Sequence, residues 1–274
     1  MMALPSFNNT NRAKQSVKPR ILVLEIRDKN QPEAKVLGLL VVEREEIYRR
    51  DPRDGEIYEA SIRLFYQRIT GRFSQGLSGR GRFDGSYSRS FNSVSVTSSS
   101  MSKGALFLDL PGLYGQRVGT YLMNEIVQWV QQWPDASVNS IELLAGQAHE
   151  KNKTRRNRFY EQFGFVFDYT DPEQREGRSR STSASALVQI ETWKQNIVEH
   201  RMLDYLTDVL NAQEHASSKL EGCKRAYAQR IAEERQAMAK PIRWALRQLY
   251  YQYASTIYVV LILIVFVVIL FLNK

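Results

Sequence analysis

The stretch LFLDLPGLYGQRVGTYLMNEIVQWVQQW, which starts at Leu106, decides the fold together with the later residues as far as Phe167. After a short linker come SIELLAG and then KNKTRRNRFYEQFGFVF. This order predicts an apolar strand, a tight loop, an amphipathic helix, a second strand, a basic helix and a short third strand. Strands joined by helices of this length indicate an α/β or α+β architecture built in layers.

The loop GQRVGT, residues 115–120, lies where the first of these strands ends and the amphipathic helix begins. The first turn of a helix has N–H groups without partners and carries the positive end of the helix dipole. Gly119 has no side chain to keep a ligand away from the backbone. The loop therefore predicts an anion-binding site.

The chain before this stretch contains an arm, three strand candidates and a long loop. Residues 1–20 are polar and basic without periodicity, and we expect a flexible arm. Ile21–Ile26, Val36–Glu43 and Glu56–Ile69 are the strand candidates, and the last of them also fits a helix. Residues 71–102 are dense in Ser, Gly and Arg and predict a loop, with a short strand near Phe91 as an alternative for part of it.

The same Ser/Gly/Arg-rich segment contains aromatic residues, and arginines with aromatics can bind single-stranded nucleic acid. No recognised nucleic-acid-binding fold accompanies it, so we do not expect a nucleic-acid partner. The net charge of +9 and the pI of about 9.6 favour anionic partners in general, such as nucleotides or anionic lipid.

The chain after the central stretch becomes helical. Residues 171–185 predict a polar loop, and Ala186–Trp193 is a further strand candidate. Residues 194–250 predict a helical stalk of two amphipathic helices that pack on each other, on the domain or on a second copy. The last of these alternatives makes the stalk a candidate for homo-oligomer formation.

Residues 254–272 predict one transmembrane helix. The segment carries no charge, and at about 1.5 Å per residue it is long enough for a hydrocarbon core of about 30 Å. Lys240, Arg243 and Arg247 precede it, so the positive-inside rule predicts a cytoplasmic location for the N-terminal body. This arrangement is typical of a single-pass, tail-anchored membrane protein.

Cysteine and histidine usage excludes several kinds of site. Cys223 is the one cysteine, so no intrachain disulfide can form, which fits a reducing compartment. His149, His200 and His215 are scattered, and no metal-ligand spacing appears. We therefore predict no metal site, and no Ser–His–Asp arrangement stands out.

Residues 106–193 resemble the GNAT superfamily of acetyl-CoA-dependent N-acetyltransferases. The family signature Gln/Arg-x-x-Gly-x-Gly/Ala corresponds to Gln116–Tyr121, and the downstream run Phe-Tyr-x-x-x-Gly-Phe corresponds to Phe159–Phe165. The two motifs stand in the family's order, and the resemblance covers about a third of the chain. It implies that residues 21–193 form an α+β domain with a mixed, mostly antiparallel sheet flanked by helices.

The resemblance also implies acetyl-CoA as co-substrate and assigns roles to residues. The cofactor-binding candidates are Gln116, Arg117, Val118, Gly119, Thr120 and Asn152. Tyr160 has the position of the family tyrosine that protonates the leaving thiolate, a task that suits a phenol of pKa about 10. Glu142, on the second strand, is the candidate base for the amine proton.

Two features depart from the family pattern. Tyr121 stands where the family keeps a small residue, and it either crowds the cofactor or points into the core. Residues 27–103 contain no clear helix pair of the kind that builds the acceptor side in the family. The favoured interpretation is a membrane-anchored N-acetyltransferase for an amine acceptor. The alternative is a degenerate scaffold or CoA-binding protein that recruits protein or nucleic-acid partners at the membrane.

Overall fold

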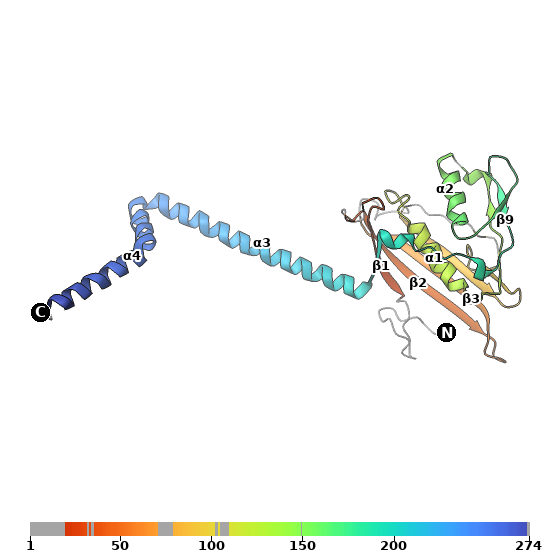
Figure 1. The fold of residues 1–274 in the computed structure, drawn as a ribbon, viewed down its shortest axis with the longest axis horizontal. Helices are drawn as coiled ribbons and strands as arrows, with labels where there is room; N and C mark the ends of the chain where they lie inside the picture. The colour runs from red at the N-terminus through yellow and green to blue at the C-terminus, as the bar shows by residue number, and fades with distance from the viewer. Residues whose placement is uncertain are drawn as a thin grey trace. The chain divides into compact units, whose positions relative to one another are not determined.

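The computed structural model describes residues 20–31, 33, 36–70, 79–101, 104, 110–148 and 150–272. The chain forms two compact units, divided after Thr207. The first unit contains the β-sheets and the two shorter α-helices, and the second is helical (Figure 1). The predicted arm falls almost wholly outside the described residues, as do 71–78 and 102 of the predicted loop and 106–109 of the predicted apolar strand that opens the central stretch.

A mostly antiparallel sheet forms the body of the first unit, which confirms the predicted α+β class. Among the described residues it has seven strands, in the order β10-β1-β2-β3-β4-β5-β6. Their bounds are β1 Ile21–Ile26, β2 Gly38–Arg50, β3 Ile57–Arg68, β4 Arg80–Ser88, β5 Ser93–Ser95, β6 Ser137–Val138 and β10 Ile197–Arg201. Each neighbouring pair is antiparallel except β5 and β6, which run parallel.

Strand β3 resolves the choice between strand and helix for residues 56–69. Its buried residues Ala60, Ile62, Leu64 and Tyr66 are two positions apart, whereas Phe65 between them is exposed. A period of two belongs to a strand with one face on the core. The segment pairs with β2 on one side and β4 on the other.

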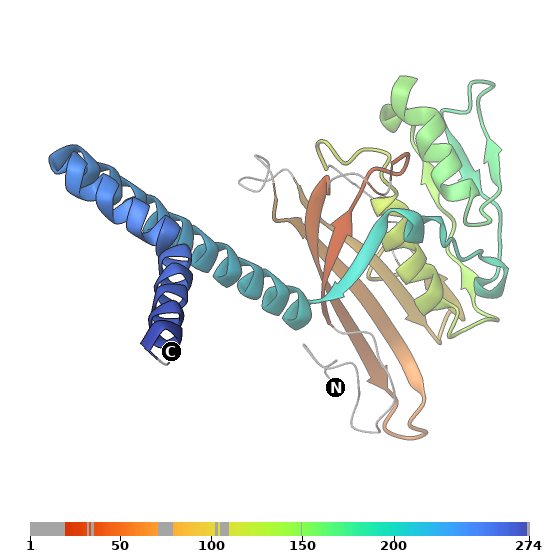
Figure 2. The same cartoon turned by 60° about the vertical axis from the view of Figure 1, so that its left-hand side comes forward.

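Helix α1, Val118–Val130, lies across one face of this sheet (Figures 1 and 2). Leu122, Ile126 and Val127 are fully buried there, as the helical spacing predicts. Each such side chain contributes about 1.5–3 kcal/mol of burial free energy. The core of the unit therefore lies between α1 and the sheet.

The predicted Ser/Gly/Arg loop is wrong for residues 80–88, which form β4, whereas β5 agrees with the short strand given as the alternative near Phe91. Gly81 and Gly85 resemble loop residues in the sequence, but both are required by packing. A Cβ on Gly85 would lie 2.8 Å from Cγ2 of Ile126, and one on Gly81 would lie 2.2 Å from the hydroxyl of Tyr66. The two glycines thus leave space for side chains that pack closely against the strand.

A smaller sheet and helix α2 complete the first unit. The sheet has the order β7-β9-β8, with antiparallel pairing throughout. The bounds are β7 Glu142–Leu143, β8 Phe167–Tyr169, β9 Gly177–Ser179 and α2 Glu150–Glu161. The predicted basic helix and the strands before and after it are therefore confirmed, whereas β9 lies in a segment predicted as loop.

The strand predicted for Ala186–Trp193 is wrong. The 3-10 helices η2, Ala184–Ala186, and η3, Thr192–Gln195, occupy its two ends. Between them the backbone finds partners outside any sheet. Val188 N donates to Phe163 O at 3.0 Å, and Ile190 N donates to Asn124 Oδ1 at 2.7 Å. The segment is therefore bonded to α1 and to the residue Phe163 after α2 instead of joining a ladder.

The C-terminal part forms helices α3, Met202–Ala239, and α4, Pro241–Leu272. The helices of the predicted stalk, residues 194–250, have other bounds in the structure. Its first residues belong to η3 and β10, and α3 then runs without interruption to Ala239. Proline suits the first turn of a helix, where its missing N–H has no helical acceptor, so Pro241 marks the start of α4. None of the side chains described in α3 is buried.

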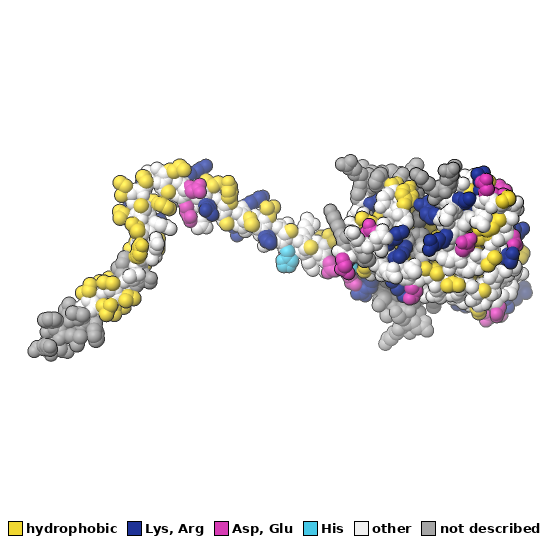
Figure 3. All heavy atoms as spheres, turned by 45° about the horizontal axis from the view of Figure 1, so that its top comes forward, with side chains coloured by type: hydrophobic (Ala, Val, Ile, Leu, Met, Phe, Trp, Pro, Cys, Tyr) yellow, Lys and Arg dark blue, Asp and Glu magenta, His cyan; other side chains and the backbone are white. Residues whose placement is uncertain are grey.

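Within the described residues, no single helix has both the length and the apolarity needed to cross a membrane. The segments Pro241–Ala254 and Tyr258–Val265 meet those requirements only as a pair, with a bend of 61°. Hydrophobic side chains cover much of the described part of α4 (Figure 3). The single transmembrane helix over 254–272 stays a prediction.

Candidate functional site

Two residues directly before α1 have a left-handed backbone conformation. Gly115 has a φ of +74°, and Arg117, the N-cap residue, has a φ of +63°. Glycine adopts such a conformation without steric cost. Arg117 is held by its side chain, because Nη1 donates to Thr192 O at 3.1 Å and to Gln195 Oε1 at 3.0 Å. It also donates to Asn196 Oδ1 at 3.1 Å, so the loop is tied to the segment before β10.

Gln116 is anchored on two sides. Its carbonyl oxygen accepts a hydrogen bond from Asn196 Nδ2 at 3.1 Å, and its side-chain Oε1 accepts one from Lys29 N at 2.9 Å. Asn196 is only 1% exposed and also donates to Arg27 O at 3.0 Å. A buried amide with this many partners fixes the loop against the end of β1.

Val118, Gly119 and Thr120 form the first turn of α1, and all three are buried. The hydrogen bond from Tyr121 N to Arg117 O, at 2.9 Å, closes the first turn. The three preceding N–H groups therefore have no acceptor within the helix. Thr120 Oγ1 accepts a hydrogen bond from Gln162 Nε2 at 3.4 Å, so the residue that follows α2 lies beside this turn.

Basic side chains surround the loop that precedes α1. The guanidinium of Arg155, on α2, lies 5.6 Å from the centroid of the Tyr114 ring. Arg68 is 6% exposed and donates from Nη1 to Pro111 O. Lys29 Nζ lies 3.7 Å from the position that a Cβ on Gly115 would take. Together with Arg117 these cations make the surroundings of the helix start electropositive.

Asn152, the remaining cofactor-binding candidate, positions a neighbour. Its Nδ2 donates to Gln147 O at 2.9 Å, and its Oδ1 accepts from Arg155 Nη2 at 2.9 Å. Because the Arg155 guanidinium lies over Tyr114, Asn152 holds a cation beside the loop. Its connection to the predicted anion site is therefore indirect.

Tyr160 lies in an aromatic cluster and retains 7% exposure. Its ring centroid is 5.1 Å from that of Phe159, 6.1 Å from that of Phe165 and 6.0 Å from that of Phe167. Burial raises the pKa of its hydroxyl to about 12, against the opposing effect of the Arg156 charge. The phenol is therefore protonated at neutral pH, as a general acid must be.

Glu142 is the first residue of β7 and is exposed. It lies directly across from Arg178 in the pairing of β7 with β9. Glu142, the candidate base, thus has a basic residue as its cross-strand neighbour. Tyr160, the candidate acid, lies instead in the aromatic cluster that α2 forms with β8.

Tyr121 points into the core, which decides between the two alternatives for its bulk. Its side chain is 1% exposed, and its hydroxyl donates to Glu199 Oε1 at 2.6 Å. Its ring packs edge-on against Trp193, with centroids 4.9 Å apart. Burial, with Glu125 and Glu199 nearby, holds the pKa of its hydroxyl well above the usual range.

Strands β5 and β6 run side by side only briefly and then part. Ser93 pairs with Ser137 and Val94 with Val138, and Asn139 N donates to Val94 O at 2.8 Å. Three residues after Asn139 the chain already belongs to β7 in the other sheet. The two parallel strands therefore diverge after Asn139.

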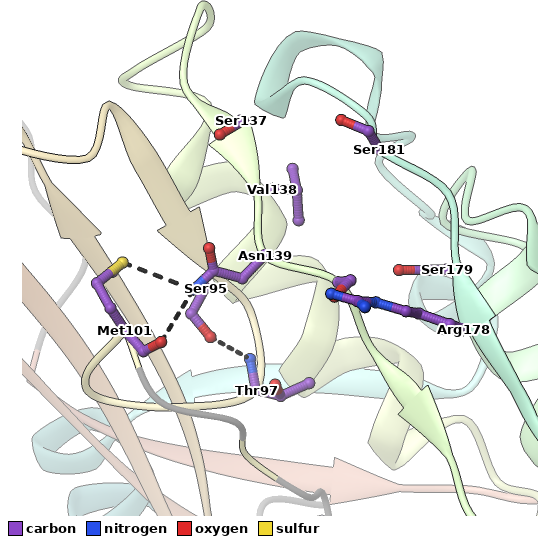
Figure 4. Close-up of a pocket in the computed structure, with 10 residues that line it drawn as sticks. Ser95, Thr97, Met101, Ser137, Val138, Asn139, Arg178, Ser179 and Ser181 are labelled. Atoms are coloured by element: carbon purple, nitrogen blue, oxygen red, sulfur yellow. Dashed lines mark hydrogen bonds between the residues drawn. The ribbon is translucent and has the colours of Figure 1, made fainter.

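A cavity of about 540 Å³ lies at this divergence (Figure 4). Its lining is rich in hydroxyl groups and includes one cation. The residues are Ser95, Thr97, Met101, Ser137, Val138, Asn139, Ser140, Arg178, Ser179 and Ser181. Sequence reasoning missed this group, because the pattern of 178–181 predicts a loop and these residues meet 95–101 only when β9 pairs with β7. It also missed Lys29 and Asn196, which no local pattern marks.

Within the part of the chain that the structure describes, no group of three or more His, Cys, Asp or Glu side chains could hold a metal ion. Comparison of the chain with protein-family models, with curated proteins and with solved structures finds no match. The functional conclusion rests on the geometry of the site and on the sequence motifs.

Proposed function

We propose that residues 21–193 bind acetyl-CoA and transfer its acetyl group to an amine, as GNAT N-acetyltransferases do. The observation that carries the proposal is the start of α1. There the N–H groups of Val118, Gly119 and Thr120 have no helical acceptor, and basic side chains surround the loop that precedes them. A helix N-terminus in such surroundings favours phosphate groups, and acetyl-CoA carries a pyrophosphate.

The divergence of β5 and β6 supports the same proposal. Strands that part leave backbone N–H and C=O groups without a neighbouring strand. The amide-bearing arm of acetyl-CoA can pair with such groups. The order β5-β6 and then β7-β9-β8, with a helix before each of β6 and β8, also agrees with the family resemblance.

Each residue has a role in this proposal. The backbone of Val118, Gly119 and Thr120 holds the pyrophosphate, and Gln116 and Arg117 hold the loop in shape through their bonds to residues 192–196. Asn152 keeps Arg155 beside the loop. Acetyl-CoA supplies the acetyl group as a thioester.

The proposed transfer forms one bond and breaks one. The amine nitrogen bonds to the acetyl carbon as the carbon–sulfur bond breaks. Tyr160, whose pKa is about 12, gives a proton to the departing sulfur, and Glu142 accepts the proton that the amine loses. A phenol that weakly acidic stays protonated until sulfur develops charge.

Calorimetric titration of the full chain in detergent with acetyl-CoA tests the binding step. We expect saturable binding, and Arg155→Gln to weaken it by about tenfold through loss of the cation beside the loop. Arg158→Gln is the matched control, because it removes the same charge from an exposed arginine of the same helix, whereas the guanidinium over Tyr114 is that of Arg155. Absence of heat up to about 10 mM acetyl-CoA would refute the proposal.

Release of free thiol in the presence of a panel of amines tests the transfer step. Tyr160→Phe keeps the aromatic packing and removes the acid, so we expect slower turnover, by about 10²-fold or more, with unchanged acetyl-CoA affinity. Glu142→Gln tests the base in the same assay. If Tyr160→Phe turns over as the parent chain does, Tyr160 is not the acid.

A second candidate function, a scaffold that binds CoA without catalysis, is favoured by one observation. In the described residues the path from β1 to β2 contains no helix, whereas the GNAT family builds its acceptor side there. Acetyl-CoA binding without turnover on any amine of the panel would support this candidate. Turnover would exclude it.

We also propose that residues 254–272 anchor the chain in a membrane, with the N-terminal body on the cytoplasmic side. The exposed apolar side chains of α4 and the basic residues before them support this. Flotation with lipid vesicles at high salt tests it, because a purely electrostatic contact is lost there. A chain that ends at Ala239 should not float.

A further inference from the structure

Part of the lining of the cavity at the divergence of β5 and β6 faces away from α1. Val94 belongs to the core that α1 covers, and successive residues of a strand point to opposite faces. Ser95 therefore points away from α1. Ser95 lines the cavity together with residues of the segment 137–140 and of β9 (Figure 4).

Arg178 supplies the cationic group of this cavity. It extends from β9 across the cavity, and its Nε donates to Ser140 Oγ at 2.9 Å (Figure 4). That bond uses one of the five guanidinium donors and fixes the plane of the group. The outer nitrogens have no hydrogen-bond partner among the described residues, and they have the spacing that suits two oxygens of one anion.

A carboxylate stands opposite Arg178 on each of its two neighbouring strands. Asp168 is opposite it on β8 and is paired with Arg180, at 2.7 Å. Glu142 is opposite it on β7. Neither carboxylate lines the cavity, whose only charged lining group among the described residues is Arg178. The lining therefore favours an anionic ligand over a cationic one.

The hydroxyl groups add further hydrogen-bonding capacity. Ser179 Oγ accepts from Ile141 N at 2.8 Å, and a hydroxyl that accepts still has its proton to donate. Ser181 is exposed at the cavity rim. Behind Ser95, its cross-strand neighbour Ser86 is 2% exposed, and its hydroxyl has no hydrogen-bond partner in the described part of the chain. This face of the sheet therefore carries buried hydroxyl groups where most protein interiors are apolar.

We propose that this cavity binds a small phosphate ester with a hydroxylated body, of the sugar phosphate class. Arg178 holds the phosphate by its outer nitrogens, and Ser95, Ser179 and Ser181 hold hydroxyl groups of the body. A cavity of about 540 Å³ is large enough for such a molecule. None of the residues assigned to the pyrophosphate of acetyl-CoA lines this cavity, so titration without acetyl-CoA tests this site by itself.

Calorimetric titration of the full chain in detergent with glucose 6-phosphate tests the proposal. We expect saturable binding that is tighter than that of inorganic phosphate by about tenfold, and no binding of glucose at the same concentrations. Arg178→Gln should weaken glucose 6-phosphate binding by about tenfold or more. Arg175→Gln is the matched control, because it removes the same charge from a nearby exposed arginine that does not line the cavity.

Further variants keep the test independent of folding defects in Arg178→Gln. Arg178→Lys keeps the charge without the planar group, so we expect an intermediate affinity. Ser181→Ala should weaken glucose 6-phosphate binding and leave inorganic phosphate binding unchanged. The proposal is overturned if the parent chain takes up no glucose 6-phosphate at about 10 mM, or if Arg175→Gln weakens binding as much as a folded Arg178→Gln does. Equal affinity for inorganic phosphate overturns the sugar phosphate assignment.

Discussion

The hydroxyl of Tyr121 donates a 2.6 Å hydrogen bond to Glu199 Oε1, which joins the first turns of α1 to β10. The bond spans 78 residues of sequence and clamps an edge strand of the larger sheet to the helix that covers it. It also explains the bulk of Tyr121, whose ring lies in the core. The position usually kept small in the GNAT pattern is therefore a structural tie in this chain.

Tyr121→Phe should lower the free energy of unfolding by about 1–2 kcal/mol, because a hydrogen bond to a charged group is lost while the ring stays packed. Urea unfolding followed by tryptophan fluorescence measures the change. Glu199→Gln keeps an acceptor for the hydroxyl and should cost less. Acetyl-CoA affinity should not change in either variant. A loss of affinity without a loss of stability would mean that the ring of Tyr121 lines the cofactor site.

A buried charge network lies farther along the same helix. Arg44 on β2 donates to Glu125 Oε2 and to Glu46 Oε1, both at 2.5 Å, and Glu125 is 4% exposed. Burial alone would lower the pKa of Arg44, but the charges of Glu46 and Glu125 outweigh it and raise that pKa. Arg44 therefore stays charged and neutralises two carboxylates under α1.

Arg44→Met should cost about 3–5 kcal/mol of folding free energy, because it removes the cation that the buried Glu125 and the partly buried Glu46 share. The matched control is Arg49→Met, five positions along β2, whose partner Glu59 is exposed. We expect that control to cost less than about 1 kcal/mol. Chemical unfolding of both variants measures the two losses of folding free energy. Equal losses would mean that the exposed pair is as important as the buried one.

The sequence predicted the elements whose pattern is local. The apolar run of β1 and the helical spacing of Leu122, Ile126 and Val127 identify their elements because each pattern repeats within a few residues. Strand β4 was missed, because Gly81 and Gly85 resemble loop residues. Their role depends on Tyr66 and Ile126, which approach only in the folded chain.

The residues of the candidate site also fall into a part that the sequence predicts and a part that it does not. The start of α1 at Val118 was predictable, because the loop-to-helix transition is encoded in neighbouring residues. Asn196, which holds that loop, and Arg178, which lines the cavity, lie far away in sequence and reach their places through strand pairing. Such contacts leave no periodic signal in a single sequence.

Tyr160 predicts a dependence of stability on alkaline pH. Its pKa is about 12 in the folded chain because of burial, and about 10 in an unfolded chain. Below pH 10 both states keep the proton, so its contribution is fully present there. As the pH rises from 10 to 12 the unfolded state loses the proton first, so the folded state loses up to about 3 kcal/mol.

Tyr160→Phe removes this loss. We expect the stability of the variant relative to the parent chain to be constant below pH 10 and to improve between pH 10 and 12. Urea unfolding at a series of pH values measures the difference, and titration of phenolate absorbance should show one fewer late-titrating tyrosine. A constant difference across the whole range would mean that Tyr160 titrates alike in both states.

Gly115→Ala tests the loop that enters α1. Gly115 has a φ of +74°, where an added Cβ costs about 1–2 kcal/mol of backbone strain. Space is not the cause, because the nearest neighbour of that Cβ would be Lys29 Nζ at 3.7 Å, an ordinary contact. The strain should displace the start of α1 and weaken acetyl-CoA binding by about tenfold.

Gly146→Ala is the control, since a Cβ there meets nothing within 4 Å. We expect it to change stability by less than about 0.5 kcal/mol. If Gly115→Ala costs stability but leaves acetyl-CoA affinity intact, the cofactor does not depend on this turn, and the anion site at the helix start has to be abandoned.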